Sequence, residues 1–305
     1  MAGVVVERAA GDAFEPASAG LPGNGGALRR RTDRRPARPG VGGRLSLGVL
    51  AAARLTRLLV LSVLVAPALL IRGALGPTRG PRVLRWYFEA CGGGYVKIGQ
   101  LLATRYDLLR AEYTEELGKL LDSLPPVPTA RIRQVIEREL GQSIADVFVE
   151  FESQPIATAS LAQVHGAMLA DGHEVVVKVL KPGIGERIRI DLRFLRLTAR
   201  VIDVLPVLGG LDVSRLIDDL SRTAIDELDL NREALYTAFI HDQMAADPID
   251  HYAPTVYRPL CSRNVLVLER IRGVTVRDML SAVNNGDDGR LEAWATRGIT
   301  PERTA

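Results

Sequence analysis

The chain has 305 residues, 47% of them hydrophobic, and a formal net charge of +3 at pH 7. A chain of this length and composition can bury one substantial hydrophobic core and still carry a tail. Its two cysteines, Cys91 and Cys261, form no CxxC pair, and its four histidines are scattered. This pattern excludes the spacing of a zinc site and favours reduced, structural cysteines. The early acids Glu7, Asp12 and Glu15 argue against a secretory signal.

Residues 1–44 are rich in Gly, Pro, Ala and Arg and lack apolar periodicity, so we expect a disordered tail. Within this tail, residues 29–38 hold six arginines and one acid. Basic runs of this kind can bind nucleic acid or anionic lipid. A solvated tail is the simpler interpretation, because aromatic residues are absent from the run. We therefore expect no nucleic-acid partner.

We expect residues 45–80 to contain an apolar helix that is followed by a break at Gly76-Pro77. Its central part, Leu58–Ile71, is uncharged over 14 residues and is bracketed by arginines. This is shorter than the ~20 residues that a membrane-spanning helix needs. Two interpretations stay open: a helix at the membrane interface, and a hydrophobic helix docked on the folded domain.

The folded part is expected to begin near Pro81 with an N-terminal helical extension over residues 81–145. Apolar residues recur there at helical spacing. Thr129 is a candidate N-cap for a helix over residues 130–140, and Gly141 is expected to end that helix.

A buried strand is expected at Val175–Leu180, where β-branched and other apolar residues flank Lys178 on both sides. A charged amine in such a strand either extends its stem to the edge of the sheet or points into a cleft to meet an anion, because desolvating an unpaired charge is costly. Asp171-Gly172 predicts a hairpin turn that leads into this strand, and Asn264–Ile271 predicts another buried strand.

Two long helices are expected between these strands, at residues 184–204 and 213–246. Helices, a β-hairpin, long helices and a further strand indicate an α+β fold built around a small antiparallel sheet.

Small residues dominate Ala157–His165, one hairpin strand before Lys178. Such residues let backbone N–H groups approach phosphate oxygens, although a tight hairpin would need small residues as well. Gly92–Gln100 places three consecutive glycines at the start of a helix, which permits close approach to another surface.

Several carboxylates lie on the helix expected at residues 213–246. Helical geometry places Asp229 and Glu233 on one face, whereas Glu227 points about 120° away from Glu233. Glu233 is therefore a candidate partner for Lys178.

Taken together, these segments resemble the UbiB/ADCK atypical kinase-like family, also called aarF-domain proteins. The resemblance runs from about Leu84 to Gly273, with mild departures at Thr158 and Leu161. It rests on motifs that occur in the family's order, namely Lys97-Ile98-Gly99-Gln100, the alanine-rich loop Ala157–His165, Asp171-Gly172, Val177-Lys178-Val179 with Lys181-Pro182-Gly183, Glu227-Leu228-Asp229, Glu233, and Glu269 with Gly273.

The resemblance implies a protein-kinase-like small lobe over residues 146–273, preceded by the helical extension. It implies a nucleotide-binding set made of Ala157, Thr158, Ala159, Ser160, Lys178, Glu233 and Glu269. It also implies a regulatory set made of Lys97, Gly99, Gln100, Glu227 and Asp229. Lys178 would contact the α/β-phosphates and pair with Glu233, and Lys97 would fold over the site to interact with Glu227 or Asp229.

The cofactor implied by the resemblance is ATP or ADP, and the activity is that of an ATPase or of a small-molecule or lipid kinase. The family supports ubiquinone and related quinone or lipid metabolism at membranes. The resemblance thus implies a membrane-associated protein, at the cytoplasmic face in bacteria or in an organelle in eukaryotes. The partners expected are a nucleotide, a membrane surface, a quinone or lipid, and further subunits in a homo- or hetero-oligomer.

The chain departs from the family beyond Gly273. Phosphoryl transfer needs a catalytic Asp and Mg²⁺ ligands, which the family carries in a His-x-Asp-x-His-Pro-Gly-Asn loop and an Asp-Phe-Gly-like segment. Only 32 residues follow Gly273, and neither motif is among them. We therefore expect residues 274–305 to be the start of a truncated large lobe, with no catalytic residue and no metal ligand in this chain. The alternative to a nucleotide-binding protein is a non-catalytic scaffold that binds a partner or a membrane.

Overall fold

The computed structural model describes residues 4–6, 52–65, 76–121, 126–204, 212–244 and 252–296. The chain forms two compact units, one from Leu47–Arg270 and one from Met1–Ser46 together with Ile271–Ala305. All the nucleotide-binding and regulatory residues expected from the sequence belong to the larger unit.

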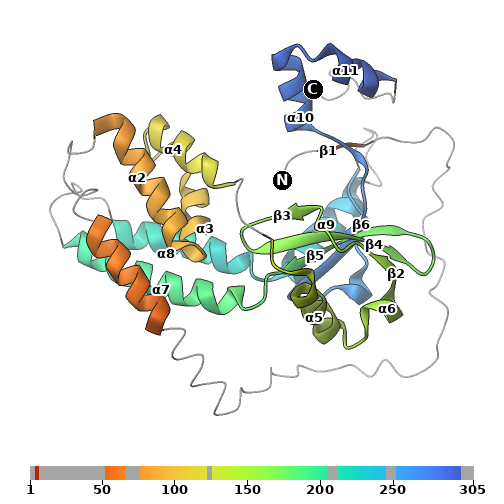
Figure 1. Ribbon diagram of the computed structural model, residues 1–305, viewed down its shortest axis with the longest axis horizontal. Coiled ribbons are helices and arrows are strands. Elements are labelled where there is room, and N and C mark those ends of the chain that lie inside the picture. Colours follow the sequence, from red (N-terminus) through yellow and green to blue (C-terminus); the bar gives the residue numbers. More distant parts are fainter. Residues whose placement is uncertain are drawn as a thin grey trace. The chain divides into compact units, whose positions relative to one another are not determined.

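A five-stranded antiparallel sheet forms the β part of the larger unit (Figure 1). Its strands are β2 (Phe148–Phe151), β3 (Ala157–Thr158), β4 (Ala162–Leu169), β5 (Glu174–Leu180) and β6 (Val265–Glu269). The order is β2-β4-β5-β6, and the short β3 pairs with β4 as well. Helices and an antiparallel sheet in one lobe confirm the predicted α+β class.

The hairpin predicted at Asp171-Gly172 joins β4 to β5. Gly172 has φ 85°, a left-handed conformation that glycine adopts without strain. In the resulting register, Lys178 on β5 lies opposite Val164 on β4 and Leu266 on β6. Lys178 therefore lies on a strand that is paired on both sides.

The two faces of β5 differ in burial, which corrects the expectation of a strand covered on both faces. Val175, Val177 and Val179 have no exposed surface and pack in one core cluster with α5 (Thr129–Leu140). The alternate residues Glu174, Val176 and Lys178 are only half-buried. An unbroken apolar run predicts a strand, but the run does not show that one of its faces is partly open.

The helices of the larger unit form most of its remainder (Figure 1). Besides α5 they are a helix over residues 52–65, α2 (Gly76–Cys91), α3 (Gly94–Leu102), α4 (Ala111–Gly118), α6 (Ile144–Val147), α7 (Ile184–Asp203), α8 (Val213–Asp226) and α9 (Leu230–Met244), with 3₁₀ turns at Lys119–Leu121 and Arg258–Leu260. A second core cluster joins the N-terminal helices to α7, α8 and the start of α9, and it reaches the sheet at Leu266.

The start of α5 differs from the prediction, whereas its end agrees. The helix predicted at residues 130–140 is α5, and Gly141 ends it with φ 72°. The predicted cap is wrong: Thr129 is the first helical residue, and its hydroxyl donates to the carbonyl of Ser153 instead.

The helix expected at residues 213–246 is two helices, α8 and α9, separated by Glu227–Asp229. The break places Leu228 in the core, and the backbone N–H of Leu230 donates to the carbonyl of Arg263. The shared face assigned to Asp229 and Glu233 on one continuous helix is therefore wrong.

The apolar helix at residues 52–65 packs against the other helices of the larger unit, which was one of the two open interpretations. Leu58 has no exposed surface and Val65 is 6% exposed. Residues 66–75, which include the rest of the predicted apolar segment, lie outside the described residues. Among the helices that the structure describes, none is both long enough and apolar enough to cross a membrane.

The smaller unit contains β1 (Val4–Val6), which pairs with β7 (Gly273–Thr275), and two helices, α10 (Val276–Asn285) and α11 (Asp288–Ala295). Thr275 caps α10 by accepting a hydrogen bond from the backbone N–H of Asp278. Apart from Val4–Val6, the tail expected at residues 1–44 lies outside the described residues.

Candidate functional site

Lys178 and Glu233 form an ion pair between β5 and α9. The Lys178 Nζ lies 2.8 Å from Oε1 and 2.7 Å from Oε2 of Glu233. The break after α8 makes this possible, because it starts a new helix whose first turn carries Glu233. The two side chains are 30% and 28% exposed, so the pair faces a partly open surface. An ammonium group held in this way is available to bind a further anionic oxygen.

A tight loop lies beside this pair, between β3 and β4. The backbone N–H of Ala159 donates to the carbonyl of Ala162, and that of Lys181 donates to the carbonyl of Leu161. The loop is thus fixed to the end of the strand that carries Lys178. Partial burial there lowers the pKa of Lys181.

The loop is also bonded to α3. The Ser160 hydroxyl donates to Oε1 of Gln100 at 3.1 Å, and Nε2 of Gln100 donates to the carbonyl of Leu120 at 3.1 Å. Of the four loop residues expected at the nucleotide site, Ser160 therefore contacts the expected regulatory set directly.

Lys97, one turn before Gln100, forms an ion pair with Glu227 at the end of α8, with 2.5 Å between Nζ and Oε2. Asp229 lies elsewhere: its carboxylate accepts a hydrogen bond from the backbone N–H of Asn231 at the start of α9. Of the two partners expected for Lys97, Glu227 is the one that the structure pairs with it.

Gly99 is required by packing. A Cβ at this position would lie 2.5 Å from Cδ1 of Leu120 and 3.0 Å from Cδ2 of Phe88. Glycine lets α3 lie directly against these two side chains.

Glu269, expected at the hinge of the nucleotide site, lies at the end of β6. Its carboxylate accepts hydrogen bonds from the hydroxyl of Tyr252 and, at 3.1 Å, from the backbone N–H of Thr255. Burial, together with this carboxylate, raises the pKa of Tyr252, so its hydroxyl stays a hydrogen-bond donor. Glu269 thus holds the segment that precedes β6.

Two buried polar residues follow the loop and fix the chain before α5. Oε1 of Gln163 accepts a hydrogen bond from the backbone N–H of Val127 at 2.6 Å, and Nε2 of Gln163 donates to the Val127 carbonyl at 3.1 Å. Gln163 also bonds to His165, which has no exposed surface and stacks on Phe151. Burial lowers the pKa of His165, so the ring is neutral near pH 7.

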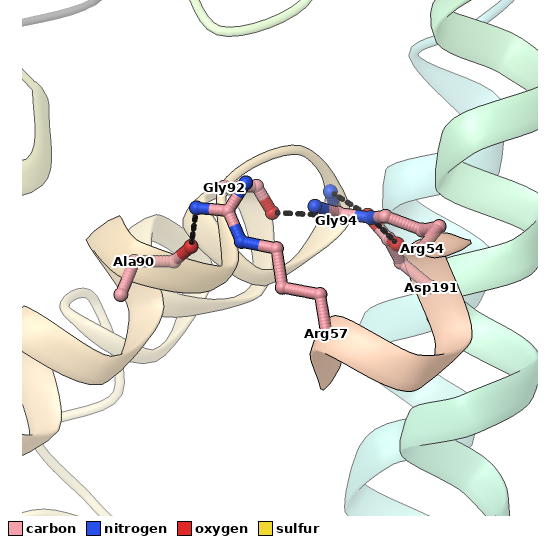
Figure 2. A network of polar contacts seen from close by, with 6 residues as sticks. All are labelled: Arg54, Arg57, Ala90, Gly92, Gly94 and Asp191. Atoms are coloured by element: carbon pink, nitrogen blue, oxygen red, sulfur yellow. Dashed lines mark hydrogen bonds and ion pairs between the residues drawn. The ribbon is translucent and has the colours of Figure 1, made fainter. Parts of the chain in front are cut away.

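The sequence prediction missed a second polar centre, at Asp191 on α7 (Figure 2). Its carboxylate accepts hydrogen bonds from Nε and Nη2 of Arg54, both at 2.9 Å, and from the backbone N–H of Gly94 at 2.8 Å. Arg54 also donates to the carbonyl of Gly92 at 3.2 Å. Burial opposes the charge of Arg54, but the hydrogen bond and the charge of Asp191 raise its pKa overall.

A signal for Asp191 is present in the sequence. The buried residues of α7 recur at helical spacing, and Asp191 falls within this apolar stripe (Ile184, Ile188, Leu192, Leu195 and Ala199). An acid at such a position needs a partner. The partner lies 137 residues away in the chain, so only the tertiary structure identifies it.

No group of three or more His, Cys, Asp or Glu residues that could hold a metal ion occurs among the described residues. What the site can do chemically is to bind an anion at Lys178, beside a loop of small residues whose position depends on α3.

Comparison with known proteins finds similar sequences and structures. The model of the family described as the ABC1 atypical kinase-like domain matches residues 119–291. A curated relative from Cellvibrio japonicus, named "Probable protein kinase UbiB", is 39% identical over 259 residues, which cover 83% of this chain and 46% of the relative. A relative of the same name from Pseudomonas aeruginosa is 39% identical over 229 residues, which cover 75% of this chain and 42% of the relative.

This chain therefore spans less than half the length of these curated relatives. Among solved structures, a complex of Rv3197 with erythromycin from Mycobacterium tuberculosis is 30% identical, with a TM-score of 0.45. That match covers 62% of this chain and 48% of the Rv3197 chain.

Proposed function

Because the chain belongs to the ABC1 atypical kinase-like family, we propose that its larger unit binds ATP or ADP at Lys178. The observation that carries the proposal is the Lys178–Glu233 ion pair on the partly open face of β5. Glu233 orients the ammonium group, which then contacts phosphate oxygens. The loop at Ala157–Ser160 lies over the nucleotide, and its small side chains let the phosphates approach the backbone. We assign Glu269, which holds the segment before β6, to the same site.

The test is a thermal-unfolding titration of the whole chain with ATP and with ADP, with and without Mg²⁺. A ligand that binds only the folded state raises the melting temperature as its concentration exceeds Kd. We expect this rise in the wild type and its loss in Lys178→Met. The matched control is Lys119→Met, which removes another ion-paired lysine, bonded to Glu116. No rise in a folded wild-type sample would contradict the proposal.

A membrane surface is the second partner that we propose, at the outer face of the helix over residues 52–65. Five apolar side chains of this helix are 40% to 69% exposed: Leu55, Leu59, Val60, Val63 and Leu64. Arg54 and Arg57 lie at the N-terminal end of this helix. An apolar helix face with basic residues beside it suits the boundary between lipid headgroups and acyl chains.

Sedimentation with vesicles of phosphatidylglycerol and phosphatidylcholine tests this contact. We expect the double variant Leu59→Gln/Val63→Gln to bind vesicles less than the wild type. The control is Leu235→Gln/Phe239→Gln, which removes two exposed apolar residues at the same spacing from α9. Equal sedimentation of the wild type and the first variant would contradict a membrane contact at this helix.

The relatives' name, UbiB, supports a role for the whole protein in ubiquinone or related quinone and lipid metabolism. In that role nucleotide binding and membrane contact serve one process, because quinones and their precursors partition into the bilayer. Phosphoryl transfer is not assigned to any residue of this chain.

The alternative function is that of a non-catalytic scaffold. One observation favours it: four large apolar residues of α9 are 39% to 62% exposed, namely Leu235, Tyr236, Phe239 and Ile240. An exposed apolar patch of this kind is typical of an interface with another chain. A scaffold would retain partner binding in Lys178→Met, and its melting temperature would not rise with nucleotide even in the wild type. The nucleotide titration therefore separates the two functions.

A further inference from the structure

The helix α3 has a fixed end and a functional end. Its first residue, Gly94, is hydrogen-bonded to Asp191 (Figure 2). Asp191 is itself bonded to Arg54 on the helix at residues 52–65, which we call the surface helix. Lys97 and Gln100 follow within the next two turns and contact Glu227 and Ser160. A helix of nine residues moves as one body, so a shift at Gly94 displaces both contacts.

The approach of α3 to Asp191 depends on glycine. A Cβ on Gly93 would lie 2.6 Å from Oδ2 of Asp191, and a Cβ on Gly94 would lie 2.9 Å from its Cβ. Gly93 also has φ 56°, which glycine adopts without strain. The glycine run thus permits one particular contact, that between the start of α3 and the Asp191 carboxylate.

The Asp191 side chain has no exposed surface, and that of Arg54 is 18% exposed. A buried carboxylate needs its donors, and removal of one partner leaves an uncompensated charge. Arg57, one turn later on the same surface helix, differs: it is exposed and donates only to the carbonyl of Ala90, at 2.8 Å (Figure 2). Of these two arginines, Arg54 therefore bonds a buried carboxylate and Arg57 an exposed carbonyl. Arg54, unlike Arg57, is linked to α3 through Asp191.

We propose that Arg54 and Asp191 are positioning residues, which set the place of α3 and thereby couple the surface helix at residues 52–65 to the loop that carries Ser160. The proposal rests on the proposed nucleotide binding at Lys178. While Arg54 and Asp191 hold α3, Gln100 keeps the loop preorganised for the phosphates and Lys97 keeps Glu227 neutralised. Release of α3 lets the loop move, and nucleotide binding then includes the entropic cost of ordering it.

The first test measures α3 itself, without nucleotide. We expect Arg54→Met to accelerate amide hydrogen exchange in α3 by about tenfold or more, while exchange in the β4–β5 hairpin stays at the wild-type rate. Arg57→Met is the matched control and leaves α3 protected. Because Arg54→Met leaves the Asp191 charge buried, the double variant Arg54→Met/Asp191→Asn is measured as well. It removes both charges and leaves Gly94 only a neutral amide acceptor that Arg54 no longer holds, so we still expect α3 to be released.

The second test measures the effect on the nucleotide site. We expect the Kd for ADP to rise by about fivefold in Arg54→Met/Asp191→Asn and to stay unchanged in Arg57→Met. If Arg54 and Asp191 act through α3, the rise in Kd requires Lys97 and Gln100. A purely structural role of Arg54 and Asp191 would raise the Kd whether or not these two residues are present. In a Lys97→Ala/Gln100→Ala background the α3 contacts are already lost, so the double variant should add no further change in Kd.

Three results would overturn the proposal: wild-type exchange rates in α3 of the charge-free double variant, an unchanged or lower Kd for ADP, or an equal rise in Kd in the Lys97→Ala/Gln100→Ala background. Failure of the proposed function is a different result, because wild-type protein would then bind no ADP. In that event the exchange comparison still decides whether Arg54 and Asp191 hold α3.

Discussion

Lys97 on α3 and Glu227 at the end of α8 form an ion pair, and Glu227 is also the residue at which the helical chain breaks before α9. The break directs two glutamates to two lysines: Glu227 to Lys97, and Glu233 to Lys178. Both pairs belong to one unit of the structure, and the loop that carries Ser160 is bonded to α3.

The Lys97–Glu227 pair should contribute little to stability. The Glu227 side chain is 43% exposed, so solvent screens the charge, and we expect Glu227→Gln to lower the free energy of unfolding by less than ~1 kcal/mol. Denaturant unfolding measures this, with Glu115→Gln on the exposed face of α4 as the control. A loss above ~3 kcal/mol would show that the pair is effectively buried.

Lys178→Met should cost more than Glu227→Gln, because it leaves the half-buried Glu233 without its partner. With about 30% of each side chain exposed, the remaining carboxylate can be hydrated. We expect the free energy of unfolding to fall by about 1–2 kcal/mol. Denaturant unfolding beside Lys119→Met measures it, and a loss of ~4 kcal/mol or more would indicate a fully desolvated pair.

Gly99→Ala and Gly118→Ala should have opposite effects on stability. The new Cβ at Gly99 meets Leu120 and Phe88, so we expect a loss of about 1–3 kcal/mol from overpacking. Gly118, the last residue of α4, has no neighbour within 4 Å of an added Cβ, and alanine there should stabilise by about 0.5–1 kcal/mol. Thermal unfolding of both variants checks the difference; equal melting temperatures would contradict the packing assigned to α3.

His165 should make stability depend on pH. Burial lowers its pKa in the folded protein below 6.5, so the unfolded chain takes up a proton at a higher pH than the folded one. The contribution is fully present above pH ~6.5 and is lost as the pH falls through the folded-state pKa. We expect His165→Gln to remove this part of the pH dependence.

Urea unfolding between pH 5 and pH 8 measures this effect. Identical profiles for His165→Gln and the wild type would show that another group is responsible.

Much of the sheet and of the candidate site follows from local sequence signals. The β-branched run around Lys178, the turn at Asp171-Gly172 and the end of α5 at Gly141 each depend on the conformational preferences of a few neighbouring residues. These signals, with the resemblance they support, also placed Lys178 and Glu233 as partners, and the structure contains that pair.

The features that could not be predicted depend on contacts between distant segments. Leu228 and Leu230 continue the apolar pattern across the break between α8 and α9, so periodicity alone favours one helix; the bond from Leu230 to Arg263 decides otherwise. The half-open face of β5 depends on which helices cover the sheet. The position of Asp191 in an apolar stripe signals a buried acid, but its partner Arg54 lies outside the segment that resembles the family.

Nucleotide binding at Lys178 is measured most directly by a calorimetric titration of the whole chain with ADP, in the wild type, in Lys178→Met and in Lys119→Met. We expect saturable binding by the wild type and by Lys119→Met, and a Kd higher by about tenfold or more in Lys178→Met, because a charge-assisted contact to phosphate is lost. Equal affinity in the wild type and Lys178→Met, or no binding by folded wild-type protein, would contradict nucleotide binding at Lys178.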